Sequence, residues 1–269
     1  MDPMNLKPDD EPYKAYVGPP TLYDFMGASQ FRLLCTLGLR AHHSLLDIGC
    51  GSLRSGRLFI NYLDEGNYFG IEPNKWLIEE AITSQVGQDL IRIKKPQFDY
   101  NSEFDTSVFS REFDFILAQS IFSHASFDLV RIALHNSKDS LKRDGLIAAN
   151  FAIGKGDSKG SRWVYPDLVN YNQETIKRLA DDAGLQIIGI PWYHPRLTWF
   201  LFTKERKRLP DRTMLRYLTG AVLYDNAFLE SWSFRHKIFR DIRNQIGLLL
   251  PEQFKTAIKK IIRFKKPEY

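Results

Sequence analysis

Short apolar runs alternate with amphipathic segments along the first three quarters of the chain. The apolar runs are brief, and several end in glycine or an acidic residue, which is typical of buried parallel strands. They predict strands over residues 44–48, 68–72, 96–100, 113–118, 146–151, 185–190 and 198–202. Between them, apolar residues recur at helical spacing, which predicts helices over residues 22–39, 54–63, 75–83, 128–141 and 173–183.

Strict alternation of strands and helices predicts a mostly parallel sheet with helices on both faces. The last two strands follow each other with only a short connection, so they must be antiparallel. We therefore expect a doubly wound α/β sheet of seven strands with the last strand antiparallel, over residues 22–205. The five prolines of residues 1–20 suggest that residues 1–21 form an extended N-terminal arm, and residues 206–269 carry only helical patterns.

Charge separates the C-terminal segment from the rest of the chain. Residues 204–269 hold 16 Lys or Arg and 7 Asp or Glu, so they carry +9 while the whole chain carries +5. Apolar residues at 254, 258, 261 and 262 share one helical face among basic residues, which predicts a basic amphipathic helix. Such a helix could contact anionic lipid, RNA or a partner, or pack on its own domain.

Composition excludes several classes of protein. Hydrophobic residues make up 43% of the chain and charged residues 26%, which argues against wholesale disorder. The two cysteines, Cys35 and Cys50, suggest no disulfide framework. No uninterrupted apolar stretch reaches 18 residues and the N-terminus lacks a signal-peptide core, so we expect a cytoplasmic protein, with peripheral contact at the inner membrane surface as an option.

A glycine loop between the first strand and the next helix carries the clearest chemical signal. Asp47, Gly49, Cys50 and Gly51 lie in this loop, where glycines allow close approach of backbone to ligand. Glu72 ends the next strand, and an acid at this position of a doubly wound fold accepts hydrogen bonds from ribose hydroxyls. Loop and acid together predict an adenosine-type cofactor, whereas the glycines alone would also suit a plain tight turn.

The order of residues in the loop distinguishes between two cofactors. A dinucleotide loop needs a third glycine at position 54, where this chain has Arg54. The acid Asp47 ahead of the glycines suits a ligand with an ammonium group better than a phosphate. The loop therefore favours S-adenosylmethionine over a nicotinamide dinucleotide.

The loop resembles the first motif, acid-x-Gly-x-Gly, of the class I S-adenosylmethionine-dependent methyltransferases, and of a bacterial subgroup whose substrate is unassigned. The resemblance covers roughly residues 22–203 and depends on Asp47, Gly49, Gly51, Glu72, Phe113-Asp114 and the closing strand pair. It implies a Rossmann-like methyltransferase domain over residues 22–205. One departure is Leu53, which stands where the family commonly has a third glycine.

The resemblance also implies roles for individual residues. Gly49, Cys50 and Gly51 would surround the methionine part of the cofactor, with Asp47 supporting it, and Glu72 would hold the ribose. The loop after the third strand usually meets the adenine, and the loop end of the fourth strand completes the pocket. These two places correspond to Asn101, Ser102 and Gln119.

The class of methyl acceptor is inferred from the motifs in the segment after the fourth strand. This segment has no Asn/Asp-Pro-Pro turn, no pair of glutamates and no cysteine, so adenine, arginine and cytosine-C5 methyltransferases are set aside. It also lacks carboxylates for a metal, so no metal is expected. His124 remains as a candidate general base, although it could instead only bond the local turn.

Four further residues are candidates for the acceptor pocket. Trp163 and Tyr165 lie in a glycine-rich insertion, Tyr23 lies near the N-terminal arm, and His194 lies between the last two strands. Each has a structural alternative as a core or turn residue. These residues favour methyl transfer to a hydroxyl, or alternatively an amine, of a small molecule or glycan. The remaining alternatives are an RNA methyltransferase using the basic C-terminal segment, and a nicotinamide oxidoreductase or non-catalytic binding protein. No DNA contact is expected.

Overall fold

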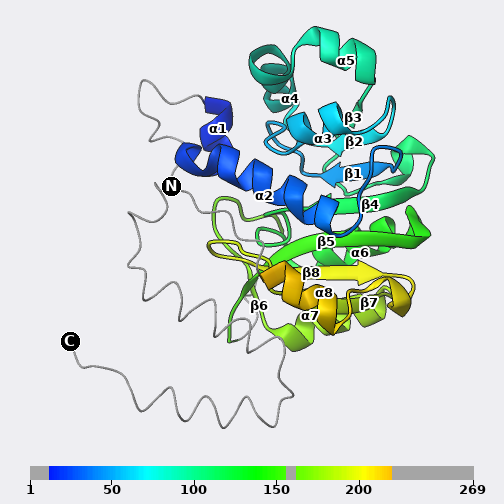
Figure 1. Ribbon diagram of the computed structural model, residues 1–269. Coiled ribbons are helices and arrows are strands. Elements are labelled where there is room, and N and C mark those ends of the chain that lie inside the picture. Colours follow the sequence, from blue (N-terminus) through cyan, green and yellow to red (C-terminus); the bar gives the residue numbers. More distant parts are fainter. Residues whose placement is uncertain (1–11, 156–161, 220–269) are drawn as a thin grey trace. The chain divides into compact units, whose positions relative to one another are not determined.

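The computed structural model describes residues 12–155 and 162–219, and it forms an α/β fold around one sheet. The strands lie in the order β3-β2-β1-β4-β5-β8-β7, and the short β6 pairs with β5 beyond this path. β8 runs antiparallel to both of its neighbours, β5 and β7, while the pairs from β3 to β5 are parallel. The predicted doubly wound sheet with an antiparallel last strand is confirmed, with β6 as an additional strand (Figure 1).

Most strands lie close to where the apolar runs predicted them. The strands are β1 Leu45–Ile48, β2 Tyr68–Ile71, β3 Gln97–Asp99, β4 Phe113–Ala118, β5 Leu141–Ile153, β6 Asn170–Tyr171, β7 Gln186–Ile190 and β8 Thr198–Thr203. The longest, β5, begins earlier than its apolar run because its first residues include charged side chains that face solvent. β1 and β4 are buried along almost their whole length, as expected for strands covered on both faces.

The α-helices are α1 Pro12–Tyr16, α2 Tyr23–Thr36, α3 Gly56–Tyr62, α4 Lys75–Ala81, α5 Gln88–Lys94, α6 Phe127–Asp139, α7 Gln173–Asp182 and α8 Arg212–Thr219. A π-turn, Ile82–Val86, continues α4, and 3-10 turns span Pro20–Leu22, Ser107–Phe109 and Arg206–Arg208. Ser126 and Asn172 cap the N-termini of α6 and α7, because their side chains accept hydrogen bonds from the backbone N–H of Leu129 and Thr175.

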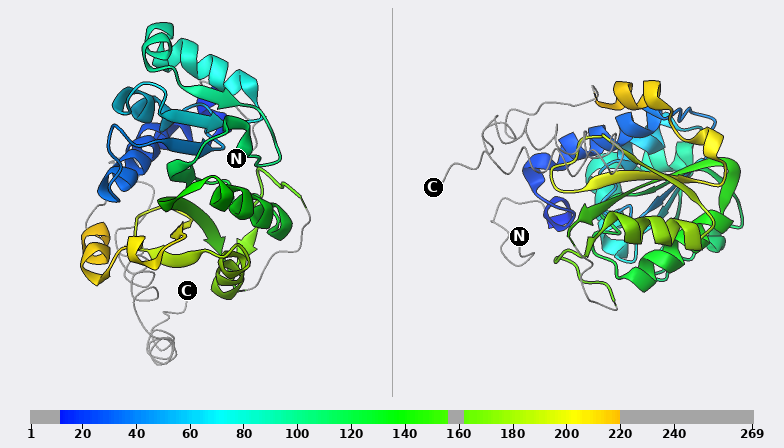
Figure 2. Two further views of the ribbon diagram at one scale, coloured as in Figure 1. Left: turned by 90° about the vertical axis from the view of Figure 1, so that its right-hand side faces the viewer. Right: turned by 90° about the horizontal axis from the view of Figure 1, so that it is seen from below.

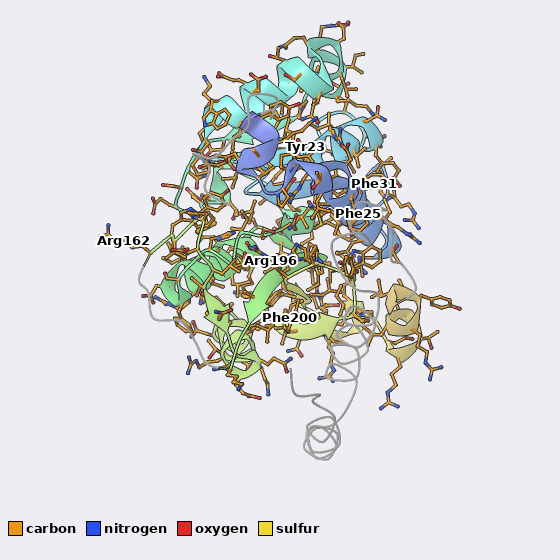
Figure 3. All side chains as sticks on the ribbon, turned by 90° about the vertical axis from the view of Figure 1, so that its left-hand side faces the viewer. Tyr23, Phe25, Phe31, Arg162, Arg196 and Phe200 are labelled. Carbon is orange, nitrogen blue, oxygen red and sulfur yellow. The ribbon has the colours of Figure 1, made fainter. Side chains whose placement is uncertain are left out.

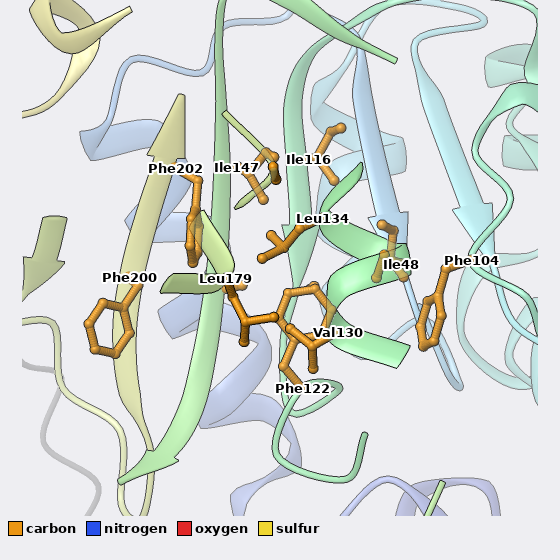
Figure 4. Close-up of a cluster of buried hydrophobic side chains, with 14 of the residues drawn as sticks. Ile48, Phe104, Ile116, Phe122, Val130, Leu134, Ile147, Leu179, Phe200 and Phe202 are labelled. Atoms are coloured by element: carbon orange, nitrogen blue, oxygen red, sulfur yellow. The ribbon is translucent and has the colours of Figure 1, made fainter. Parts of the chain in front are cut away.

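Two layers of helices bury the two faces of the sheet. Successive side chains of a strand point to opposite faces, and β4 shows this directly. Ile116 packs with Val130 and Leu134 of α6, as drawn in Figure 4. Its neighbour Phe115 packs on the other face with residues of α2, α3 and α8. The helices lie on both sides of the strands in the second view of Figure 2.

The prediction of an extended N-terminal arm is wrong for the described part of that arm. Residues 12–16 form helix α1, and residues 20–22 form a 3-10 turn. Proline is compatible with the first turn of a helix because the N–H groups there have no partner within the helix. Tyr13 and Tyr23 bury their rings together with Leu77 of α4, which gives this segment a small core of its own.

Helical structure continues after β8, as predicted, with the turn Arg206–Arg208 and α8. The chain divides into two units, residues 1–223 and 224–269, and the described residues all belong to the first. The predicted amphipathic helix near residue 258 lies outside the described residues, so its contacts with lipid or RNA stay predictions, as do the domain boundaries. Among the described helices, none is long and apolar enough to cross a membrane.

Candidate cofactor and acceptor site

A pocket of about 790 Å³ opens at the carboxyl ends of β1, β2 and β4. In open parallel sheets, ligands bind at this edge because the strands end there in loops. The pocket wall includes every predicted cofactor residue and three of the four predicted acceptor residues. They are Asp47, Gly49, Cys50, Gly51, Glu72, Asn101, Ser102, Gln119, Trp163, Tyr165 and His194, and the candidate base His124 also lines the pocket.

At two positions of the glycine loop after β1, a side chain would clash with neighbouring residues. Gly49 has φ +67°, and a Cβ built on it would lie 2.0 Å from the Cδ1 atom of Ile121. A Cβ on Gly51, at φ +53°, would lie 2.7 Å from the side chain of Val17. Leu53 also has a positive φ of +54°, and its side chain is fully buried. The loop thus keeps a left-handed residue where the family commonly has its third glycine, at a conformational cost of about 1–2 kcal/mol.

Asp47, the last residue but one of β1, presents a buried carboxyl group to the pocket. The hydroxyl of Tyr68, on the adjacent strand β2, donates a hydrogen bond of 2.9 Å to its Oδ2 atom. Burial raises the pKa of Asp47 to about 7, although Tyr68 and the nearby Arg54 oppose the shift. A cationic group of a ligand would favour the ionised carboxylate, so Asp47 is poised to gain charge when such a group binds.

Glu72, directly after β2, links the loops of two strands. Its Oε2 atom accepts a hydrogen bond of 3.1 Å from the backbone N–H of Gly51. Its Oε1 atom accepts from the backbone N–H and the side-chain amide of Asn74, at 2.9 and 2.7 Å. Burial raises its pKa, and these hydrogen bonds counteract the rise. A carboxylate fixed in this way can accept further hydrogen bonds from two neighbouring hydroxyls with little reorganisation.

The loop after β3 forms the wall next to Glu72. The side chain of Asn101 bonds Asp99 and Asp105, which closes the loop on itself. Ser102 is exposed and donates a hydrogen bond to Glu103. Both line the pocket, together with the ring of Phe104. The loop therefore offers a flat apolar contact and polar groups at the place predicted for adenine.

Arg54 lies at the centre of a polar cluster that connects three distant parts of the chain. Its guanidinium donates to the backbone carbonyl of Val17 at 2.9 Å and to Oε1 of Gln119 at 2.5 Å. The same oxygen of Gln119 accepts a hydrogen bond from Gln30 on α2. Burial lowers the pKa of Arg54 to about 10, so it stays a cation at neutral pH. This positive charge lies beside Asp47 and partly neutralises it.

Residues from the N-terminal segment cover the cofactor side of the pocket. Residues 15–19 and Leu22 belong to its wall. Arg54 binds this segment through Val17, and the hydroxyl of Tyr165 donates to the carbonyl of Tyr16. In Figure 1 the segment, coloured blue, lies at the edge where β1 ends. The pocket is therefore closed by chain elements that are remote from the glycine loop in sequence.

His124 lies in the turn after β4 with its ring nearly buried. Its Nδ1 atom is 2.6 Å from the backbone carbonyl oxygen of Asp167. A carbonyl can only accept, so Nδ1 carries the proton and the neutral ring has its lone pair on Nε2. Burial lowers the pKa of His124, and the charge of Arg196 adds to the decrease. The imidazole is therefore neutral at pH 7 and able to accept a proton.

Aromatic rings and a second histidine complete the wall around His124. The ring of Tyr165 lies edge-on at 5.0 Å between centroids, and that of Trp163 lies at 5.8 Å. The Nδ1 atom of His194 accepts hydrogen bonds from the backbone N–H groups of Leu197 and Arg196, at 3.0 and 3.2 Å. His194 thus lines the pocket but holds its own turn, which agrees with its structural alternative.

The prediction for Tyr23 is wrong, because it does not line the pocket. Its ring is buried, and its hydroxyl donates to the carbonyl of Ser52 at 2.8 Å while accepting from Gln85. Figure 3 shows Tyr23 at the start of α2, apart from Arg196. The side chain supports the glycine loop from behind. Its position in sequence, next to the N-terminal segment, did not distinguish the two sides of the loop.

Comparison with known proteins agrees with this geometry. Residues 46–147 match the family model of a methyltransferase domain, which spans β1 to the first half of β5. The matched part, which holds the glycine loop and Glu72, is similar to a methyltransferase domain. No curated protein matches the sequence significantly.

Solved structures share the fold of the methyltransferase domain at low sequence identity. Magnesium protoporphyrin IX methyltransferase from Synechocystis PCC 6803, with bound S-adenosylmethionine, is 12% identical with a TM-score of 0.53, over 72% of this chain and 89% of that one. DesVI from Streptomyces venezuelae is 14% identical with a TM-score of 0.52, over 71% and 95%. The glycopeptide N-methyltransferase MtfA with S-adenosylmethionine is 10% identical with a TM-score of 0.52, over 66% and 94%.

These comparisons agree with the S-adenosylmethionine site that the glycine loop predicted, since two of the similar structures hold S-adenosylmethionine. Sequence reasoning missed Gln30, Tyr16, Val17 and Arg196 as parts of the pocket. Of the residues that bind one another around the pocket, only Arg54 was recognisable from the sequence, because an arginine inside a glycine loop is unusual. The other four lie in segments with no motif, and only the tertiary fold brings them to the pocket.

Proposed function

We propose that this methyltransferase transfers the methyl group of S-adenosylmethionine to a hydroxyl group of a small molecule or glycan. The observation that carries the proposal is the orientation of His124, whose Nδ1–H is bound to the carbonyl of Asp167 and whose Nε2 is left as a proton acceptor. A hydroxyl must lose its proton to become a good nucleophile, and a neutral histidine suits this task near pH 7.

In the proposed reaction the acceptor oxygen attacks the sulfonium methyl group in line. The new O–CH₃ bond forms as the S–CH₃ bond breaks, S-adenosylhomocysteine leaves, and the hydroxyl proton passes to Nε2 of His124. Bound S-adenosylmethionine supplies the activated methyl group. Asp47 attracts the ammonium group of the cofactor, and Glu72 accepts hydrogen bonds from the ribose hydroxyls. The loop with Asn101 and Ser102 contacts the adenine. Holding both reactants in one pocket supplies most of the rate advantage of such a transfer.

The test is methyl transfer from S-adenosylmethionine labelled on the methyl group to a panel of phenols, sugars and amines. Mass spectrometry of the product identifies whether oxygen or nitrogen has gained the methyl group. Replacing His124 by Gln should lower turnover of a hydroxyl acceptor by about a hundredfold or more while cofactor affinity is nearly kept. A matched control is His135→Gln, since His135 is a surface histidine bonded to Asp182 outside the pocket.

The outcomes separate the acceptor classes. Methylated oxygen with strong dependence on His124 supports the proposal. Transfer to amines alone, with turnover unaffected by His124→Gln, would contradict it, because a neutral amine needs no base before attack. Tight, salt-dependent RNA binding with methylation of RNA would instead support the RNA alternative and give a role to the basic C-terminal segment.

A further inference from the structure

Charge is divided unequally along the pocket. Its two carboxylates, Asp47 and Glu72, both lie at the carboxyl ends of β1 and β2, on the side assigned to the cofactor. The cofactor side also holds Arg54 beside Asp47, whereas the side near His124 has no carboxylate in the pocket wall and has the guanidinium of Arg196. A cationic cofactor suits the acidic side. The opposite side favours a ligand with negative charge.

Arg196 is a cation that has no partner among the residues the structure describes, on a turn held by hydrogen bonds to His194. It lies between β7 and β8, where its own N–H and that of Leu197 are both bound to the ring of His194. The backbone is therefore fixed, while the residue is exposed at the pocket wall. Its guanidinium makes no hydrogen bond or ion pair with any residue in the described part of the chain. By contrast, Arg54 is bound to Val17 and Gln119.

Arg196 and His124 line the same pocket, and the charge of Arg196 adds to burial in lowering the pKa of the histidine. Figure 3 shows Arg196 in the middle of this face, between α2 above it and Phe200 of β8 below it. A bound anion next to Arg196 would thus lie close to the proposed base. It would also offset a positive charge that otherwise opposes protonation of His124 during the reaction.

An exposed aromatic ring lies on the same side of the pocket. Trp163 is 46% exposed although it lines the pocket, and its ring lies 5.8 Å from that of His124. Large exposed aromatic side chains at a pocket offer a flat apolar surface on which a ligand ring can stack. Arg196, His124 and Trp163 thus provide an anion contact, a proton acceptor and a stacking surface within one cavity.

We propose that the methyl acceptor is a hydroxylated ring compound that carries a carboxylate or phosphate group, and that Arg196 selects it by binding this anion. The ring stacks on Trp163 and directs its hydroxyl to Nε2 of His124. This inference rests on the proposed function, which it narrows to acidic acceptors. Guanidinium binds both anions through paired N–H donors, so the two sources share one recognition chemistry.

The experiment measures calorimetric binding of matched ligands to the full chain saturated with S-adenosylhomocysteine. The carboxylate pair is 3,4-dihydroxybenzoate with its uncharged amide, and the phosphate pair is glucose 6-phosphate with glucose. We expect the anionic member of at least one pair to bind about tenfold or more tightly, as for a charge-assisted hydrogen-bonded pair. Which pair shows the preference identifies the anion.

Variants test whether Arg196 causes the preference. Arg196→Gln should reduce the ratio of affinities within the preferred pair to about twofold or less, and Arg196→Lys should retain part of it. The matched control is Arg162→Gln, which removes the same charge from an exposed residue next to Trp163 that does not line the pocket. This control should keep the preference, since a general effect of net charge would reduce it equally.

Equal affinities within both pairs, no binding of either anion, or a preference that persists in Arg196→Gln would each overturn the inference. The proposed function fails separately. Anion binding through Arg196 without methyl transfer to any hydroxyl would reject the proposed function and leave only the anion site at Arg196 standing. Methyl transfer to hydroxyls without preference for anionic acceptors would do the opposite.

Discussion

The hydroxyl of Tyr165 donates a hydrogen bond to the backbone carbonyl of Tyr16, 149 residues earlier in the chain. Their rings also lie 5.5 Å apart, between centroids. Tyr165 borders the acceptor side of the pocket next to His124, and Tyr16 belongs to the segment that covers the cofactor side. One contact therefore joins the covers of the two halves of the site, so that separating the two covers must break it.

Replacing Tyr165 by Phe should speed the release of the cofactor. The ring remains, but the carbonyl of Tyr16 loses its donor, and one hydrogen bond of this kind contributes about 0.5–1.5 kcal/mol. We expect the dissociation rate of S-adenosylhomocysteine, measured by stopped-flow displacement, to rise about two- to tenfold. Tyr217→Phe is the control, because Tyr217 is 70% exposed on α8. An unchanged rate would mean that the N-terminal segment stays closed without this bond.

The rate of methyl transfer should fall only at a pH below the usual pKa of histidine. His124 acts as a base only when neutral, and burial lowers its pKa below 6.5. The active fraction therefore rises with pH through a pKa lower than 6.5, and the neutral form predominates at pH 7. A profile of kcat/KM for the acceptor against pH, measured at saturating S-adenosylmethionine so that Asp47 is already ionised, gives the midpoint of this limb. A midpoint above 6.5 would contradict the assignment of His124 as the base.

Much of the sheet could be predicted because apolar periodicity alone decides which segments are buried. β4 was predicted with its observed limits, since every residue but Asp114 is apolar and buried between two helical layers. The glycine loop was predicted for a related reason. Positive φ at Gly49 and Gly51 is a local requirement that the sequence itself displays.

The covers of the pocket could not be predicted in the same way. Arg54 binds Val17, 37 residues earlier, and nothing in either segment specifies the other. The prolines before residue 21 indicated an extended arm, yet the burial of Tyr13 against Tyr23 and Leu77 stabilises a short helix there. These contacts depend on the tertiary fold, which overrides a weak local preference.

Substituting Ala at two glycines should separate steric conflict from backbone strain. Gly49 and Gly66 both have positive φ, +67° and +73°, so Ala costs each about 1–2 kcal/mol in conformational energy. At Gly49 the new Cβ would clash with Ile121, whereas a Cβ on Gly66 would have no atom within 4 Å. Overpacking adds about 1–3 kcal/mol. Urea unfolding should therefore show a larger loss of stability for Gly49→Ala than for Gly66→Ala. Equal losses would mean that Ile121 moves aside without cost.

Binding of the cofactor should release a proton from Asp47. The carboxyl group has a pKa of about 7 in the free protein, so at pH 6 most molecules hold it protonated. The ammonium group of S-adenosylmethionine favours the carboxylate, which lowers this pKa and expels the proton. Cofactor affinity should accordingly increase as pH rises from 6 toward 7, and the increase should level off above the pKa of the free group.

Calorimetry at pH 6 in two buffers of different ionisation enthalpy counts the protons released. We expect a value approaching one for the natural protein, and a value near zero for Asp47→Asn, which has no proton to lose. Tyr68→Phe provides a graded test. Without the hydrogen bond from Tyr68 the ionised form loses a donor, so the pKa of Asp47 rises further and release persists at higher pH. If the natural protein released no proton at pH 6, Asp47 would either be ionised before binding or stay protonated in the complex, and both outcomes contradict this prediction.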